Sequence, residues 1–347
     1  MKRSVYLLLT WLVFLLFTPC LNAQDPAKPK EKEKPQEGWK TGAGLGLDFA
    51  QLLQINPRQG AGQNRLGFGS AFNFYGNLRK GRLAWDNASI WQFGIQRLGA
   101  GVIAQGVTQK KIPFQKAIDE LRLNSKIGYQ ISKKSKFFYA ADLSFLSQLT
   151  KTYQGNKEYP GNFLTDVAGT GKILSKFFSP ATITISIGFD FKPDNSLSFY
   201  YSPVGGKFII VGNDVIASYG VHGNPVEGMP DPTTGRYAEY DNTFAALGSL
   251  LRTKYANKFF KDKIAFAASL TLFSNYIKNA QNIDVDWTNE LAVQLAKGLQ
   301  ATVTVNVFYD DDVMVQITDY SYPNGIRGLG RRVSLTQQLL LKYNVVF

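Results

Sequence analysis

Hydrophobic and polar residues alternate along most of the chain, and the last fifteen positions show the pattern most clearly. Every second residue from Val333 to Phe347 is apolar except Gln337, and the residues between them are mostly polar. A period of two predicts a β-strand with one apolar and one polar face. An exposed apolar strand at a chain end invites aggregation, whereas in a closed barrel the last strand pairs with the first. The last strand of a soluble sandwich remains the alternative at this point.

Eleven further segments with the same alternation precede this strand. The segment near Pro203 is irregular, and since proline removes a ladder donor we expect a bulge there. No stretch after the N-terminal apolar run has a sustained helical period. The predicted strands cover residues 39–53, 66–78, 83–97, 118–131, 137–149, 182–191, about 197–211, 243–255, 264–276, 283–295, 299–309 and 333–347.

The connections between these segments alternate in length. Most of those after odd-numbered strands are long, for example 98–117, 150–180 and 212–242, whereas those after even-numbered strands are short, for example 79–82 and 296–298. A transmembrane barrel has this alternation, with long extracellular loops and short periplasmic turns, and strands of about 11–13 residues suit a tilted crossing. A soluble sandwich does not require it. We therefore predict an all-β, transmembrane antiparallel up-and-down β-barrel of about 12 strands.

The N-terminal segment has the features of a secretory signal peptide. Lys2 and Arg3 precede an apolar run over residues 5–17, and Ala23 follows as a small residue suited to cleavage. Cys20 raises the alternative of a lipoprotein, but Pro19 before it argues against this. We expect a signal peptide at 1–23, a flexible periplasmic tail at 24–37 and an outer-membrane barrel at 38–347. Cys20 is the only cysteine, so the mature chain then has no disulfide and no thiolate chemistry.

The formal net charge of +13 is distributed along the turns rather than gathered on one surface. Many lysines and arginines occupy the short turns, among them Arg79, Lys80 and Lys134. There they would face anionic lipid headgroups. A nucleic-acid-binding surface would instead combine clustered basic residues with stacking aromatics, so we expect no nucleic-acid partner.

Several short stretches resemble a Bacteroidota family of uncharacterised outer-membrane β-barrel proteins, built on a domain of unknown function. They are WDNASIWQFG at 85–94, LNSKIGY at 123–129, YSPVGGKFIIV at 201–211, SNYIKNAQNIDVDW at 274–287 and YDDD at 309–312. The resemblance runs from about residue 39 to 347, with Ala280 where the family has proline. It implies a barrel in the outer membrane of a diderm bacterium. The even number of predicted strands places both termini on the side of the short turns, which is the periplasm. It implies no activity, so no functional residue is carried over.

The composition disfavours an enzyme. His222 is the only histidine and lies in a predicted long loop, where we expect it to be exposed to solvent. A Ser-His-Asp hydrolase needs a histidine held beside a serine, and zinc sites need several histidine or cysteine ligands. A pair of carboxylates for glycoside hydrolysis is not excluded by spacing, but no residue is marked as its acid. We expect no catalytic residue, no cofactor and no resident metal.

Charged residues on the polar faces of the predicted strands would point into the lumen. They could form a charged constriction that filters solutes. Equally, they could form paired side chains that hold the barrel together, because unpaired buried charges are costly. Both interpretations remain open. The candidate filter residues are Asp142, Asp190, Asp284, Asp286, Glu290, Arg122, Lys126, Arg252, Lys254 and Lys342.

Two other features suggest partners. The run Asp310, Asp311 and Asp312 could bind calcium through carboxylate oxygens, although acids at a loop are usually just solvated. Tyr343, Val345 and Phe347 resemble the C-terminal signal by which outer-membrane barrels reach the barrel-insertion machinery.

The leading functional hypothesis is a passive channel or carrier for small solutes, whose identity the sequence leaves open. The alternative is a closed barrel that binds a ligand or partner at the surface, or is structural, without transport. An embedded enzyme comes third.

Overall fold

The computed structural model describes residues 37–55, 65–97, 113–156, 161–311, 315–319, 321 and 326–346. The predicted signal peptide and almost all of the predicted tail lie outside these residues. The first strand begins at Gly38, where the sequence pattern placed the start of the barrel.

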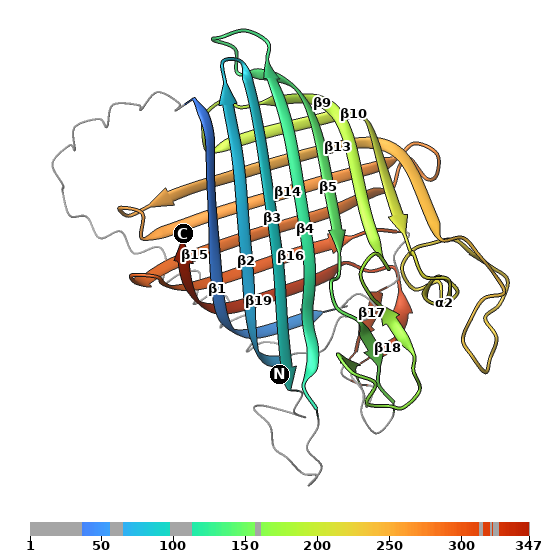
Figure 1. The fold of residues 1–347 in the computed structure, drawn as a ribbon. Coiled ribbons are helices and arrows are strands. Elements are labelled where there is room, and N and C mark those ends of the chain that lie inside the picture. The colour runs from blue at the N-terminus through green and yellow to red at the C-terminus, as the bar shows by residue number, and fades with distance from the viewer. Residues whose placement is uncertain are drawn as a thin grey trace. The chain divides into compact units, whose positions relative to one another are not determined.

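Twelve long antiparallel strands close into a barrel (Figure 1). Each strand pairs with its neighbours in the sequence, so the topology is up-and-down, as predicted. The strands are β1 (Gly38–Ile55), β2 (Arg65–Lys80), β3 (Leu83–Arg97), β4 (Gln115–Gln130), β5 (Phe137–Ser147), β9 (Ala181–Phe191), β10 (Leu197–Ile210), β13 (Thr243–Phe259), β14 (Ile264–Asn275), β15 (Ile283–Ala296), β16 (Leu299–Tyr309) and β19 (Ser334–Val346).

The first and last strands close the barrel. β19 lies antiparallel to β1, with Tyr343 opposite Leu47 and Leu335 opposite Ile55, and its other edge pairs with β16. Neither terminal strand has a free edge, because β1 also pairs along its length with β2. The predicted partnership of the first and last strands is confirmed.

The outer face of the barrel is apolar and exposed, while the inner face carries most of the polar and charged side chains. Ile187 on β9 is 67% exposed and Phe68 on β2 is 61% exposed. In contrast, Ser186 and Asp190, which point inward from β9, are each 1% exposed. A soluble protein rarely exposes a continuous apolar band, whereas a barrel in lipid requires one. This outer face defines the strands as membrane-spanning.

The irregularity predicted at Pro203 is a β-bulge. The register of β10 shifts against both neighbouring strands between residues 201 and 205. The Ser202 hydroxyl donates to the Val204 carbonyl at 2.7 Å, which stabilises the bend locally. Proline has no N–H to give to the ladder, so the register shift falls where the donor is missing.

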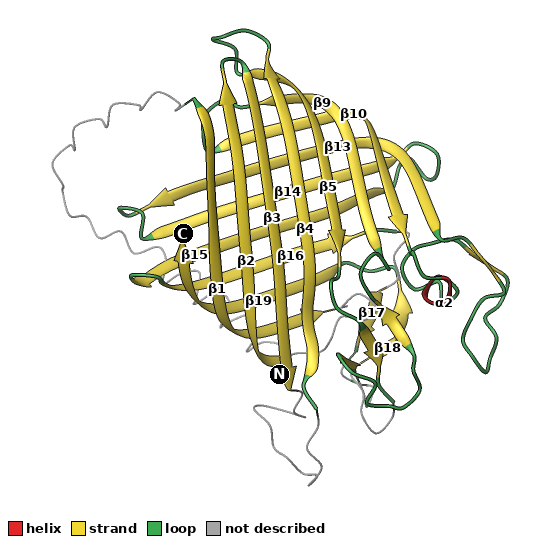
Figure 2. Cartoon of the chain, in the orientation of Figure 1, coloured by secondary structure: helices red, strands yellow, loops and turns green. Residues whose placement is uncertain are grey.

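The long loops carry short elements that the sequence pattern did not predict (Figure 2). In α2 the Asn213 side chain caps the first turn by accepting from the Ile216 N–H. The short elements are β6 (Thr152–Gln154), β7 (Asn162–Phe163), β8 (Ile173–Ser175), α2 (Asp214–Ala217), β11 (Val226–Glu227), β12 (Glu239–Tyr240), β17 (Val315–Thr318) and β18 (Ile326–Gly330). Within the described ranges, no helix has the length and hydropathy needed to cross a membrane.

Two apolar clusters lie away from the outer face. One is inside the barrel, where Tyr200 and Phe273 pack with Ala140, Ala246 and Leu250. The other lies in the loops, where Val211, Ile216 and Ala217 pack together with partly buried neighbours. The first cluster fills part of the lumen, and the second gives the loops a small core of their own.

Candidate solute path through the barrel

One side of the lumen is filled by paired charges. Arg252 on β13 donates to Asp142 on β5 at 2.6 Å, and Lys126 on β4 lies 2.7 Å from Asp190 on β9. Both carboxylates are almost fully buried, with side-chain exposures of 4% and 2%. Each pair joins strands that are not neighbours in the sheet, so the side chains reach across the inner surface.

Tyr200 connects these two ion pairs to the apolar cluster. The Lys126 ammonium lies 4.5 Å from the centre of the Tyr200 ring, and the Tyr200 hydroxyl is 3.0 Å from the Ser186 hydroxyl. A cation over an aromatic face is an attractive contact, and a buried hydroxyl needs a hydrogen-bond partner. This side of the lumen is therefore a packed layer, and we call it the filled half (β4, β5, β9, β10 and β13).

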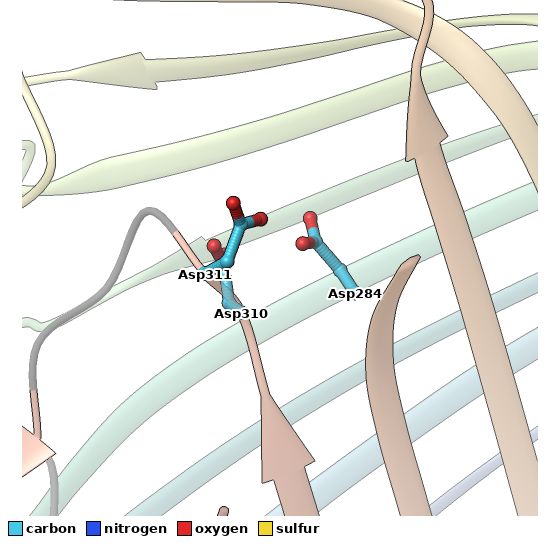
Figure 3. A group of neighbouring side chains, drawn as sticks. All are labelled: Asp284, Asp310 and Asp311. Atoms are coloured by element: carbon cyan, nitrogen blue, oxygen red, sulfur yellow. The ribbon is translucent and has the colours of Figure 1, made fainter. Parts of the chain in front are cut away.

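Three carboxylates gather where β15 begins and β16 ends (Figure 3). Ligand atoms of Asp284, Asp310 and Asp311 lie within 4.8 Å of one another. The Lys207 ammonium contacts two of them, at 3.2 Å from Asp284 and 2.9 Å from Asp310. The cluster differs from the predicted calcium ligands, because Asp284 lies with Asp310 and Asp311, and Asp312 lies outside the described residues. A lysine already provides positive charge at this place.

The remaining candidate filter residues also lie on lumen faces, and all but one contact a partner. Glu290 and Lys342 approach to 3.4 Å across β16. Lys254, in the described part of the chain, forms no ion pair. The other contacts are Arg122 with Glu120 at 2.7 Å and Asp286 with the Asn306 amide at 2.9 Å.

The opposite side of the lumen holds a cavity of about 560 Å³. Its wall on β1, β2 and β3 includes several residues without a side chain, among them Gly44, Gly46, Gly67 and Gly69. The facing wall comes from β15, β16 and β19 and includes the Glu290–Lys342 pair. The space is open because glycine brings no side chain into the lumen. We call this side the open half.

The open half was not predicted, although the sequence contains its signal. Glycines occupy alternate positions at 42, 44 and 46 and again at 67 and 69. In a strand, alternate positions share one face, so these runs mark a strip of wall without side chains.

The single histidine lies in the long loop between β10 and β13. His222 is half-buried rather than exposed, and its Nε2 contacts the Leu174 carbonyl at 2.7 Å, so the expectation of a solvent-exposed histidine was wrong. Burial lowers the pKa of His222, and this loop hydrogen bond offsets the shift only in part.

Of the predicted assembly signal, Tyr343 lies on the outer face and is 52% exposed. The Val345 backbone pairs with Leu45, and Phe347 lies outside the described residues.

One family model matches part of the chain. It is described as "Protein of unknown function (DUF3078)" and covers residues 53–153, from the end of β1 into β6. The motifs at 85–94 and 123–129 fall inside this segment, whereas the other three motifs quoted above lie outside it. Among curated proteins, no sequence matches significantly.

Solved structures of bacterial outer-membrane barrels are similar to this chain along most of its length. An outer membrane channel from Pseudomonas putida F1 is 9% identical, with 91% of this chain and 100% of that chain covered and a TM-score of 0.39. The translocator domain of the autotransporter NalP from Neisseria meningitidis is 8% identical, covers 90% of both chains and has a TM-score of 0.35. OprB from Pseudomonas putida is 9% identical, covers 89% of this chain and 94% of that chain, and has a TM-score of 0.32.

Proposed function

We propose that this protein is an outer-membrane β-barrel that lets small solutes diffuse passively through the open half of its lumen. The observation that carries the proposal is the cavity of about 560 Å³ between the glycine-lined strands and the Glu290–Lys342 pair. A volume of this size lies within the range of ~300–1,000 Å³ that small ligands occupy.

The two faces of the barrel and its connections support a placement in the outer membrane. The exposed apolar outer face suits lipid, and bacterial barrels place short turns in the periplasm and long loops outside. In this orientation both termini are periplasmic and the loop elements, including α2, face the exterior. Outer-membrane lipid and the barrel-insertion machinery are then its expected partners.

The filled half has a structural part in this proposal. Two of its ion pairs are each neutral overall and connect two strands across the inner wall. These pairs are Asp142–Arg252 and Lys126–Asp190. The charges that remain beside the path are Glu290 and Lys342, which also compensate each other. Passage of this kind needs no catalytic residue and no cofactor.

A closed barrel without transport is the second candidate. The packed layer around Tyr200 favours it, because it reduces the open cross-section. The small core of the loops favours it as well, because it orders a surface for a partner. Such a barrel would bind a ligand or partner through its loops, and it would carry no current.

Conductance of the purified, refolded barrel in a planar bilayer separates the two candidates. We expect discrete channel events, reduced by Ala71→Trp, which inserts a large ring from β2 into the open half. The matched control is Leu143→Trp on the outer face of β5, which should conduct as the wild type does. Glu290→Ala should leave Lys342 uncompensated and shift ion selectivity towards anions. Absence of events in the wild type would overturn the channel.

A further inference from the structure

Side-chain amides gather around the open half of the lumen. Gln92 and Gln96 project from β3, and Gln300 and Gln338 project from β16 and β19 on the other side of the cavity. Asn73 on β2 also lines this cavity. A carboxamide offers both a donor and an acceptor and carries no charge, so this wall matches neutral solutes with many hydroxyl groups.

Gln96 stands out among these amides. Its side chain is 1% exposed, and its Oε1 has no hydrogen-bond partner among the described residues. Its Nε2 donates to the Gln115 Oε1 at 3.5 Å, which is a long and therefore weak hydrogen bond. Buried polar groups are nearly always paired, so a small rotation of this amide towards the adjoining cavity would let its Oε1 accept from a ligand hydroxyl.

The charge of the open half is balanced. The Glu290 carboxylate and the Lys342 ammonium lie 3.4 Å apart, and neither dominates the field along the path. Tyr75 adds an aromatic surface from β2, and its ring lies over Gly42, where a Cβ would come within 2.5 Å of the hydroxyl. Aromatic and amide groups without net charge suit a sugar ring better than an anion or a cation.

We infer that the open half selects neutral, polyhydroxylated solutes of the size of small sugars, and that Gln96 forms part of a binding subsite for them. The inference rests on the proposed channel function for transport, whereas the binding subsite can be tested independently. The solute is held by exchange of hydrogen bonds between its hydroxyls and the amides, and it passes without any covalent step.

The transport test compares solutes of equal size in proteoliposomes that contain the full mature barrel. Glucose should enter faster than gluconate and glucosamine, which carry opposite charges. Maltose added to a conducting bilayer should block current reversibly. Gln96→Leu should weaken the block roughly two- to tenfold, as expected for one net hydrogen bond. Gln92→Leu serves as a second variant, and Thr184→Val, on the lumen face of β9 away from the cavity, is the matched control.

Titration calorimetry with maltose, on the detergent-folded barrel, measures binding without transport. We expect heat of binding that Gln96→Leu weakens and Thr184→Val leaves unchanged. If the barrel carries no current but this pattern appears, the channel function fails and the sugar subsite stands. If the barrel conducts but maltose neither blocks the current nor binds, the channel function stands and the selectivity for neutral solutes is overturned. The same holds if gluconate or glucosamine enters the proteoliposomes faster than glucose.

Discussion

Arg252 Nη1 and Asp142 Oδ1 lie 2.6 Å apart, although the two residues are 110 positions apart in the sequence. They project from β13 and β5, and two strands, β10 and β9, lie between these in the wall. Their contact spans the inner surface of the barrel. It connects strands that share no backbone hydrogen bond.

Breaking this pair should destabilise the barrel. Asp142→Asn leaves the Arg252 guanidinium, only 13% exposed, without its counter-charge. Removing one partner of a buried pair typically costs about 3–5 kcal/mol, whereas replacing both by uncharged groups is often nearly neutral. We expect the urea midpoint of unfolding to fall in Asp142→Asn and to recover in Asp142→Asn/Arg252→Met. Equal instability of the single and double variants would contradict a pairing role.

A lysine at Ile187 should be costly because this residue faces lipid at the middle of β9. Charge on the lipid face of a barrel costs about 2–4 kcal/mol at the bilayer midplane. Thr304→Lys is the matched control, since Thr304 faces the lumen opposite Glu290 in the register of β15 and β16. We expect Ile187→Lys to lower the yield of folded, heat-modifiable barrel on an unboiled gel and Thr304→Lys to retain it. A similar loss in both variants would argue against the assigned faces.

The strands could be predicted from the sequence because each carries its own signal. The alternation that sends Ile187 outward and Ser186 inward is visible within a few residues, and proline at 203 marks its own bulge. The partner of Arg252 could not be predicted, because it depends on the curvature of the wall between β5 and β13. Local alternation gives the face of a residue but not which distant residue it meets.

The two halves of the lumen escaped prediction for a related reason. The sequence left open whether the polar-face charges form a filter or stabilising pairs, and the Asp142 and Asp190 carboxylates lie in ion pairs within a packed layer. The space lies instead where glycine adds nothing to the lumen, and Gln96 became notable only once its burial was known. The short loop elements, such as α2 with four residues, are below the length at which periodicity is detectable.

The C-terminal aromatic residues should matter more for assembly than for conductance. Tyr343 lies on the lipid-facing side of β19 opposite Leu47, and Phe347 belongs to the same predicted assembly signal. We expect deletion of Phe347, and Tyr343→Ala to a smaller degree, to reduce the amount of barrel inserted in cell membranes. The molecules that do insert should conduct normally in a bilayer. The control is Leu339→Ala on the same face of β19. If the variant without Phe347 inserted at the wild-type level, the assignment of these residues as an assembly signal would be wrong.

The three-aspartate cluster should bind calcium only when its lysine is removed. Lys207 occupies the position of a cation, at 3.2 Å from Asp284 and 2.9 Å from Asp310, so Ca²⁺ would have to displace it. Calcium prefers several carboxylate oxygens at about 2.3–2.6 Å. We expect millimolar Ca²⁺ to raise the unfolding midpoint of Lys207→Met and to leave the wild type unchanged. Lys207→Met/Asp311→Asn is the control. Wild-type stabilisation by Ca²⁺ would show that the lysine does not compete.

Acid should loosen the loop that holds His222. Burial disfavours the imidazolium and lowers the pKa of His222 below its ordinary value of 6.5, and the bond to the Leu174 carbonyl only partly opposes this. In the opened loop the histidine regains its ordinary pKa, so below about pH 6.5 the open form binds more protons than the closed form. The stability of the closed loop is therefore full above this pH and decreases as the pH falls towards the folded-state value.

Hydrogen exchange at residues 173–175 and 213–242, corrected for intrinsic rates, measures this opening. Protection should be lower near pH 5 than near pH 7, because protons favour the open form in that window. His222→Gln keeps a donor for the Leu174 carbonyl but has no group that titrates there, so its corrected protection should not change with pH. A wild-type loop equally protected at both pH values, or a glutamine variant with the same pH dependence, would assign the opening to another group.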